Sequence, residues 1–441
     1  MPDDGPSHPR TSPDPVPEPI ADTSPAATRR GIIRRAVAGV AIDLSPMRES
    51  RDFRLLLAGQ GVSFAGSMIT YVAVPYQAYV LTRSSLVVGL VSLAELLPIL
   101  LMAFVGGALA DAVDRRRMVR ITEVGLCAVV SVLVVNAALP HPQLWVLFVA
   151  VALAAGIDAV QRPSLDALVP RIVRPEQLSA AAALESLRGN LGQVLGPPLA
   201  GVLIATVGLP GTYGVDVATF LVSLIALRLM GAVPPPPSEV GRLDVRSVLA
   251  GVGYAWRRQD LLGSYLVDMN AMFFGMPMAL FPQIAATFGG PAVLGVLYTA
   301  PSVGSLLASL TSGWTRAVRH HGRAIAMAAA AWGVAIVGFG LAPTLWLALL
   351  ALAAAGAADM ISGLFRTTLW NQTIPDAMRG RLAGIEMISY SSGPALGNLE
   401  AGLVGALAGV RVSVVSGGIL CVLGTALLSA VLPRFRNYRA T

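Results

Sequence analysis

Long apolar stretches alternate with short polar connections along most of this 441-residue chain. An α-helix needs about 20 consecutive, mainly apolar residues to cross the hydrocarbon core of a bilayer. Six such stretches occupy the first half, at residues 55–81, 86–110, 118–139, 144–168, 184–207 and 211–230. Six more occupy the second half, at residues 261–284, 292–314, 324–342, 345–366, 383–408 and 412–432. The pattern predicts an all-α membrane protein with twelve transmembrane helices.

The polar segments divide the chain into five expected parts. Residues 1–27 are rich in Pro, Asp, Ser and Thr, which is typical of disorder, and the short apolar run at 36–44 follows two arginine pairs, which favours an interfacial helix. We therefore expect a cytoplasmic tail at 1–50, an N-terminal six-helix bundle at 51–230, a cytoplasmic linker with four consecutive prolines at 231–258, a C-terminal six-helix bundle at 259–433 and a cytoplasmic tail at 434–441.

The two halves resemble each other in sequence. An offset of 206 residues superposes Gly89 on Gly295, Ala94 on Ala300 and Gly107 on Gly313. Outside this offset, Gly196-Pro197 is matched by Gly393-Pro394, and Asp158 by Asp359. Two parallel six-helix repeats are the plan of transporters that rock one half against the other around a central site. The repeat predicts this architecture.

The arginines indicate the orientation of the helices. Those in the even-numbered connections are Arg115, Arg116, Arg117, Arg120, Arg171, Arg174, Arg242, Arg246, Arg257, Arg258, Arg316, Arg319, Arg323, Arg379 and Arg381. The odd-numbered connections carry Arg83 and Arg411. Because cytoplasmic loops are enriched in basic residues, we expect both termini and the linker to lie in the cytoplasm.

Composition excludes several classes of protein. The chain is 55% hydrophobic and 13% charged, whereas a soluble domain carries about a quarter charged residues. All 32 basic residues are arginine, so the lysine of a standard nucleotide-binding loop is missing. Only four histidines and two cysteines occur, which disfavours a membrane enzyme or a metal site. We expect no nucleic acid, nucleotide or cofactor, since the basic residues follow the membrane loops.

The second apolar stretch ends in a motif that combines Gly107, Leu109 and Asp111 with the run Arg115–Arg117. It resembles the loop 2–3 signature of the major facilitator superfamily, although Ala112 and Asp114 depart from the usual pattern. The resemblance implies the major facilitator fold and a conformational role for these residues, which in that family brace the two halves at the cytoplasmic side.

The fifth apolar stretch carries a second motif made of small residues and proline. Its residues Gly192, Gly196, Pro197 and Gly201 resemble the antiporter signature of the exporters in that superfamily. Small residues at every fourth position allow close helix packing, and proline bends the helix. Further stretches resemble the enterobactin-exporter group: 82–89, 163–170, Asp216 to Ser223, 274–282 and 375–381. The resemblance covers about residues 53–432 and implies export of siderophores or drug-like amphiphiles.

Ionisable groups within the apolar stretches are candidates for function, because each is costly at mid-bilayer. They are Glu95, Asp158, Arg162, Asp268, Asp359, Arg366 and Glu400. Asp158 and Arg162 share a helix face, as do Asp359 and Arg366, so structural ion pairing and proton coupling both stay open for the two acids. Glu95 and Asp268 have no arginine close by on their own helix and are equally open to proton carrying or hydrogen bonding. Glu400 is expected to be solvated near the outer surface.

Polar and aromatic side chains of the first helix are candidates for the substrate cavity: Gln60, Tyr71, Tyr76 and Gln77. The leading hypothesis is a monomeric, proton-coupled exporter of small amphiphiles in the inner membrane that works by rocker-switch alternating access. An uptake transporter of the same fold and a membrane sensor or assembly factor that has lost transport are the alternatives. The expected partners are the substrate, protons and the lipid bilayer.

The arginine distribution yields a test of topology. Cysteines placed one at a time at 140–143 should react with a membrane-impermeant maleimide added to intact cells, while cysteines at 234–246 should react only after permeabilisation. Labelling in the reverse pattern would overturn the predicted orientation.

Overall fold

The computed structural model describes residues 43–112, 114–231, 253–254, 256 and 258–439, and in 103–112 and 376–388 only the backbone. Contacts separate Met1–Asp43 from a compact unit, Leu44–Thr441. The expected disordered tail, the interfacial helix at 36–44 and most of the linker at 231–258 lie outside the described residues. Everything that follows concerns the unit Leu44–Thr441.

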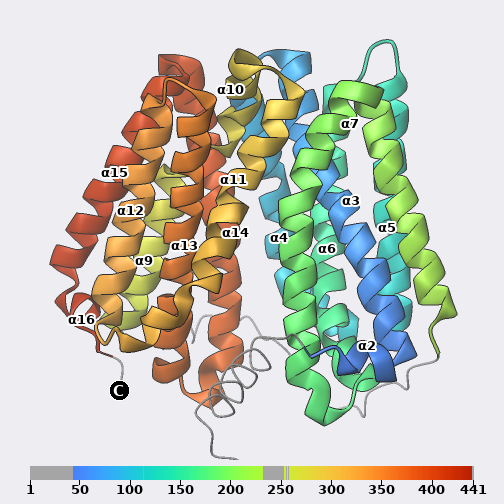
Figure 1. The fold of residues 1–441 in the computed structure, drawn as a ribbon, viewed down its shortest axis with the longest axis horizontal. Coiled ribbons are helices and arrows are strands. Elements are labelled where there is room, and N and C mark those ends of the chain that lie inside the picture. Colours follow the sequence, from blue (N-terminus) through green and yellow to red (C-terminus); the bar gives the residue numbers. More distant parts are fainter. Residues whose placement is uncertain (1–42, 113, 232–252, 255, 257, 440–441) are drawn as a thin grey trace, which may run out of the picture. The chain divides into compact units, whose positions relative to one another are not determined.

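Within this unit the described residues form helices joined by short connections, without a strand. The first group of helices comprises α2 (Ser45–Glu49), α3 (Arg51–Thr82), α4 (Ser85–Ala112), α5 (Arg115–Ala138), α6 (Leu144–Ile172), the 3₁₀ turn η1 (Pro175–Gln177) and α7 (Leu178–Leu229). The second group comprises α9 (Gln259–Phe274), η2 (Met278–Leu280), α10 (Phe281–Phe288), α11 (Pro291–Leu310), η3 (Ser312–Ala317), α12 (His321–Leu341), α13 (Leu345–Thr373), α14 (Asp376–Ala408), α15 (Val410–Val431) and α16 (Pro433–Arg436). Figure 1 shows the two groups side by side.

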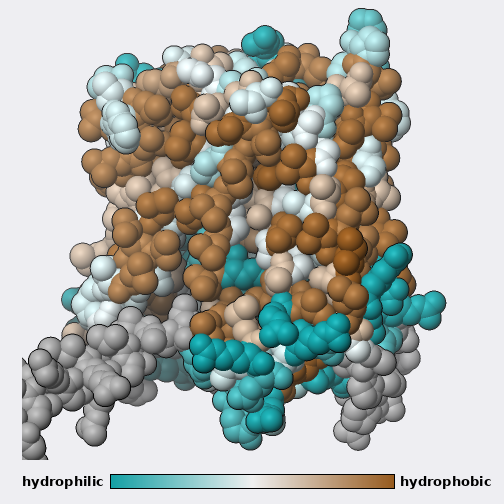
Figure 2. Space-filling model, turned by 45° about the vertical axis from the view of Figure 1, so that its right-hand side comes forward, coloured by the Kyte–Doolittle hydropathy of each residue, from teal (hydrophilic) through white to brown (hydrophobic). Residues whose placement is uncertain are grey.

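Ten of the described helical segments are long and apolar enough to cross a membrane. One of them, α7, contains two crossings, because the backbone turns back at Gly208, where φ is 71°. The 33-residue α14 adds a further helix of spanning length. The described helices thus accommodate the twelve crossings expected from the sequence, and apolar residues dominate the face shown in Figure 2 above a hydrophilic lower end.

The stretch at 261–284 was expected to be one helix, and the structure corrects this expectation. The helix α9 ends before Gly275, and η2 and α10 follow. Backbone groups released by the break must be paired inside the protein, because lipid offers no hydrogen bonds. The Gly275 carbonyl accepts from Trp332 Nε1 at 3.1 Å, and the Ala279 N–H donates to Asn398 Oδ1 at 3.0 Å. The break is therefore a supported feature of this helix.

The bundle of helices has two ends. We call the end at which α3, α5, α9 and α12 begin the arginine-rich end, because the arginine-bearing connections adjoin it. We call the other one the opposite end. At the arginine-rich end Ser50 caps α3, accepting from the Phe53 N–H at 3.1 Å and donating to the Ile172 carbonyl at 2.6 Å. Arg116 donates to the Leu227 carbonyl at 2.8 Å and so satisfies the last turn of α7.

Four glycines bring the two groups of helices together toward the opposite end. Gly89 of α4 faces the backbone of Asn398 and Leu399 in α14, and Gly402 of α14 faces Ser85 and Leu86 in α4. Gly201 of α7 and Gly295 of α11 face each other's helices in the same manner. A Cβ at any of the four would collide with backbone atoms of the other group. We call these four residues the glycine gate; Gly89 and Gly295 are the pair that the sequence repeat matched.

The glycine gate yields a prediction about access from the opposite end. Valine at Gly89 should overpack the α4–α14 contact and destabilise the closed arrangement of this end by about 1–3 kcal/mol. Because about 1.4 kcal/mol is tenfold in an equilibrium constant, the open arrangement should become more populated. A cysteine replacing Ser67, which lines the cavity described below, should then react several-fold faster with an impermeant maleimide added on the side that the α5–α6 connection faces.

The matched control is Gly214→Val, because nothing lies within 4 Å of a Cβ built at Gly214. Both variants are made in a Cys127→Ser, Cys421→Ser background. Equal labelling rates in the two variants would show that the α4–α14 contact does not close this end.

Candidate functional site

A cavity of about 680 Å³ lies between the two groups of helices. Most of its walls come from α3, α4, α6 and α7, and α5, η2, α11 and α14 contribute a smaller part. Its lining runs from Leu56 and Val169, near the arginine-rich end, to Val74 and Val88, nearer the opposite end. Gly201, Gly295 and Gly402 lie further toward the opposite end than the lining residues of their own helices, and Gly89 lies level with that limit, beside Val88. The cavity is thus closed at the opposite end by packed helices.

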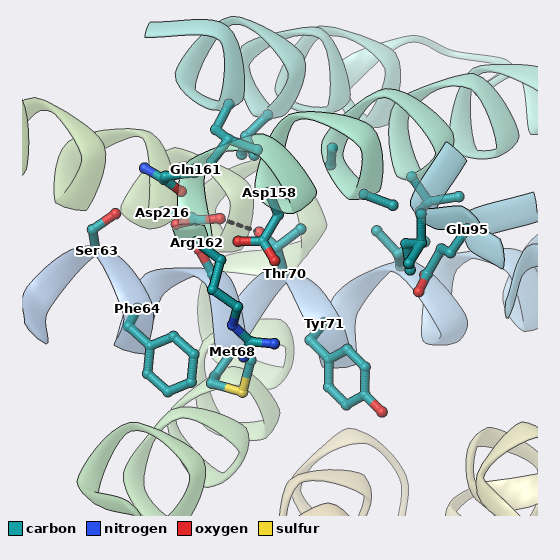
Figure 3. Close-up of a pocket in the computed structure, with 18 of the residues that line it drawn as sticks. Ser63, Phe64, Met68, Thr70, Tyr71, Glu95, Asp158, Gln161, Arg162 and Asp216 are labelled. Carbon is teal, nitrogen blue, oxygen red and sulfur yellow. Dashed lines mark hydrogen bonds between the residues drawn. The ribbon is translucent and has the colours of Figure 1, made fainter. Parts of the chain in front are cut away.

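Several candidate residues predicted from the sequence line this cavity: Gln60, Tyr71, Glu95, Asp158 and Arg162. Figure 3 shows Glu95 and Asp158 on different helices around the space beside α3. Within the described residues neither acid belongs to an ion pair. The ion pair between Asp158 and Arg162, one of the two alternatives left open by the sequence, is not formed within the described residues. Arg162 Nη1 instead donates to the Tyr390 hydroxyl of α14 at 3.0 Å.

Aromatic and thioether side chains supply the apolar part of the lining. Phe64, Met68 and Tyr71 follow one another along α3 on the side toward which Arg162 extends (Figure 3). Tyr71 crosses to the second group of helices, where its ring lies edge-on to Tyr298 with centroids 5.6 Å apart and its hydroxyl is 3.5 Å from Met278 Sδ. A cavity that combines acids, two arginines and aromatic rings can hold a molecule with both polar and apolar parts.

Other candidates lie away from the cavity. Gln77 is buried and accepts a hydrogen bond from the Tyr213 hydroxyl at 2.8 Å, and Tyr76 packs against the apolar cores of both groups. Asp268 forms an ion pair with Arg366, and Arg366 Nη2 also lies 3.7 Å from Asp359 Oδ1. Asp268 has no arginine nearby on its own helix, and its cationic partner comes from α13 instead. For Asp359, the contact with Arg366 is the ion pairing that the sequence left open beside proton coupling.

The two sequence motifs differ in the helices that they contact. In the antiporter-like motif, Gly192 and Gly196 contact Phe64 and Met68 of α3, while Pro197 and Gly201 contact α11. This motif therefore packs α7 against both groups of helices. In the loop 2–3 motif, Arg116 bonds α7 of its own group, and Asp114 caps α5 by accepting from the Arg117 N–H at 2.8 Å. Gly107 and Asp111 belong to the part of α4 for which the structure describes only the backbone.

A network of buried acids in the cavity wall was not predicted from the sequence. Glu123 of α5 is 1% exposed and accepts hydrogen bonds from Gln60 Nε2 at 2.5 Å and Gln161 Nε2 at 3.2 Å. Asp216 of α7, noted only within a resembling stretch, is 0% exposed and bonded to Thr70. The polar face of α3 could have indicated this network, because buried polar side chains need hydrogen-bond partners. Its residues Gln60, Ser63, Ser67 and Thr70 recur at helical spacing.

Comparisons with known proteins agree with this geometry. A family model described as transmembrane secretion effector matches residues 41–439. The enterobactin exporter EntS of Citrobacter koseri is 30% identical over 407 residues, covering 90% of this chain and 96% of that protein. EntS of Escherichia coli K12 is 29% identical over 408 residues, covering 91% and 96%.

Solved structures show the same fold. The nucleoside transporter NupG gives a TM-score of 0.69 at 12% identity, covering 86% of this chain and 98% of that chain. A bacterial homologue of the iron transporter ferroportin in an inward-facing state gives 0.67 at 17% identity, covering 88% and 98%. The chain belongs to the transmembrane secretion effector family of the major facilitator superfamily and is a multi-pass membrane transporter, not an enzyme.

Proposed function

We propose that this chain is a monomeric proton antiporter of the inner membrane that exports small amphiphilic molecules, siderophores or drug-like compounds, from the cytoplasm. The observation that carries the proposal is the cavity between the two groups of helices, closed at one end by the glycine gate. Its relatives named enterobactin exporters support the direction and the substrate class. The arginine distribution supports cytoplasmic termini and linker.

The distribution of contacts supports rocker-switch alternating access. With the arginine-rich end in the cytoplasm, the described conformation is closed toward the outside. Opening the opposite end requires the glycine gate to separate and the arginine-rich ends of the two groups to approach. The Arg162–Tyr390 bond already joins the groups on the arginine-rich side of the gate. The loop 2–3 motif with Asp111 is proposed to stabilise one of the two states.

The acids of the cavity are the first candidates for proton coupling. Glu95 and Asp158 face the space that a substrate would occupy, so a proton or a polar substrate group can bind them in turn. Asp268 and Asp359 are the second candidates, since the two acids share Arg366 and one arginine cannot neutralise both. Gln60 and Tyr71 are proposed to contact the substrate from α3.

Transport into proteoliposomes tests the proposal, with iron-free enterobactin and ethidium as the probes. An acidic lumen should drive at least one probe inward above its outside concentration, because protons leaving the lumen exchange for substrate. Nigericin, which collapses the pH gradient, should abolish the accumulation. Glu95→Gln should reduce it, while Glu176→Gln, at an exposed acid of η1, should leave it unchanged.

The reversed gradient separates antiport from the alternatives. Accumulation only with an acidic exterior would indicate symport and therefore uptake. Absence of transport of both probes under either gradient, by protein that is folded and inserted, would favour a sensor or assembly factor.

A further inference from the structure

Glu123 and Asp216, two acids of the first group of helices, have neutral hydrogen-bond partners within the described residues. Glu123 and Asp216 are both fully buried. Within the described residues neither is paired with an arginine, whereas Asp268 and Glu185 are, through Arg366 and Arg188. Holding an ionised carboxylate away from water is costly unless a charge or several hydrogen bonds compensate it. These two acids therefore depend on hydrogen bonds alone.

The hydrogen bonds of Glu123 are unequal for its two oxygens. Oε1 accepts both amide hydrogen bonds, from Gln60 and from Gln161. Among the described residues Oε2 accepts from the Ser63 hydroxyl, at 3.3 Å, and that hydroxyl also lies 3.4 Å from Oε1. An amide N–H can only donate, but a hydroxyl can donate or accept. Oε2 is thus the oxygen that can take up a proton and donate it to Ser63 while Oε1 keeps both amide bonds.

Asp216 has the same arrangement with two threonines. Thr70 of α3 bonds Oδ2, and Thr219 bonds Oδ1 at 3.1 Å. Both hydroxyls can turn to suit either the carboxylate or the carboxylic acid. Gly66 makes the close approach of α3 possible, since a Cβ there would collide with Thr219 and the Asp216 carboxylate. Asp216 is held against α3 by neutral, adaptable partners.

Both acids line the cavity, and one amide joins Glu123 to the helix that carries Asp216. Ser223, seven residues after Asp216 on α7, accepts from Gln60 Nε2 at 3.0 Å, and the same amide bonds Glu123. Glu123, Asp216, Ser63 and Thr70 all line the cavity, and Figure 3 shows Ser63, Thr70 and Asp216 beside it with the Thr70–Asp216 bond drawn. Each acid can therefore exchange a proton with the cavity that it lines.

Two further acids, Asp158 of α6 and Glu95 of α4, line the same cavity and belong to no ion pair of the described residues. The other titratable and charged groups around the pair have partners of their own or are neutral. Cys127 lies one turn after Glu123 on α5, and its thiol contributes no charge when protonated. Tyr213 donates to Gln77 Oε1. On α6, Arg162 bonds Tyr390. From α7, Arg188 donates to the Gln60 carbonyl at 3.2 Å, but its Nε is held by Glu185 at 2.9 Å.

We infer that Glu123 and Asp216 form a proton-binding site behind α3 that exchanges a proton with the cavity during each transport cycle. The step is the transfer of one proton to Glu123 Oε2 or Asp216 Oδ2, which turns a carboxylate into a neutral acid and later reverses; no other bond changes. The inference rests on the proposed proton antiport, and it adds the place at which the proton is held. The movement of α3, which carries Ser63 and Thr70, couples the site to the cavity.

Infrared titration of the purified full-length protein tests the site without any substrate. The carbonyl stretch of protonated carboxylic acids should appear and disappear with pH in the wild type. Carboxylic acids shielded from water absorb at a higher frequency than hydrated ones, and the double variant Glu123→Gln, Asp216→Asn should lose part of this higher-frequency component. Glu176→Gln, at an exposed acid, should lose none of that component. A titrating signal of unchanged amplitude in the double variant would overturn the inference.

Transport by the single variants tests the coupling. Glu123→Gln and Asp216→Asn imitate the protonated acids at nearly equal volume, so the hydrogen-bond network should survive. Both should exchange labelled for unlabelled probe, whichever of enterobactin and ethidium the wild type carries, within about twofold of the wild-type rate. Gradient-driven accumulation should fall to the level of empty liposomes.

The outcomes separate the two claims. If the wild type accumulates a probe and both variants do so equally, the proton is held elsewhere and the inference fails while the proposed function stands. If the wild type exchanges a probe but never accumulates it under a pH gradient, proton antiport fails, and the inferred coupling fails with it. Loss of exchange as well as accumulation in both variants would show a structural role and would also contradict the inference.

Discussion

Inside a bilayer every polar group must find its partner within the protein, and the described structure is organised by this requirement. It explains why the described spanning segments are helices, whose backbone hydrogen bonds are internal. It also explains the support around the break between α9 and α10, where Trp332 and Asn398 pair with the released backbone groups. The buried acids Glu123, Asp216 and Asp268 follow the same rule, because each is met by an amide, a hydroxyl or an arginine.

The second organising feature is the uneven contact between the two groups of helices. Toward the opposite end, glycine and proline let α4 meet α14 and α7 meet α11 at the distance of backbone contact. Backbone contacts of this kind have little side-chain entropy to lose, so they can form and separate without repacking large residues. The cavity occupies the space on the arginine-rich side of these contacts. An internal repeat in the sequence thus becomes a pair of related contacts that close one end of a binding space.

Much of the fold could be predicted from the sequence, because hydropathy and arginine placement report on single helices and their ends. The helix bounds differ from the predicted ones by a few residues at most ends. Pairing of Asp359 with Arg366 could be considered from the sequence because both lie on one face of α13. The ion pair of Asp268 was missed because its arginine belongs to α13 rather than α9. Glu123 was missed because it lies one turn beyond an arginine run, a position where solvation is the ordinary expectation, whereas α3 and α6 cover it completely. Partners across helices are set by packing, which the periodicity of one helix does not report.

Proton-driven exchange between two access states is the central claim, and a distance measurement at varied pH tests it most directly. Spin labels at His141, in the α5–α6 connection, and at Thr344, in the α12–α13 connection, would report the separation of the two groups at the opposite end by pulsed electron spin resonance. The account predicts two populations of distance, one short as in the described structure and one longer, whose proportion changes with pH. It further predicts that the pH dependence is lost in the Glu123→Gln, Asp216→Asn double variant. A single distance at every pH, or a pH response that the double variant retains in full, would contradict it.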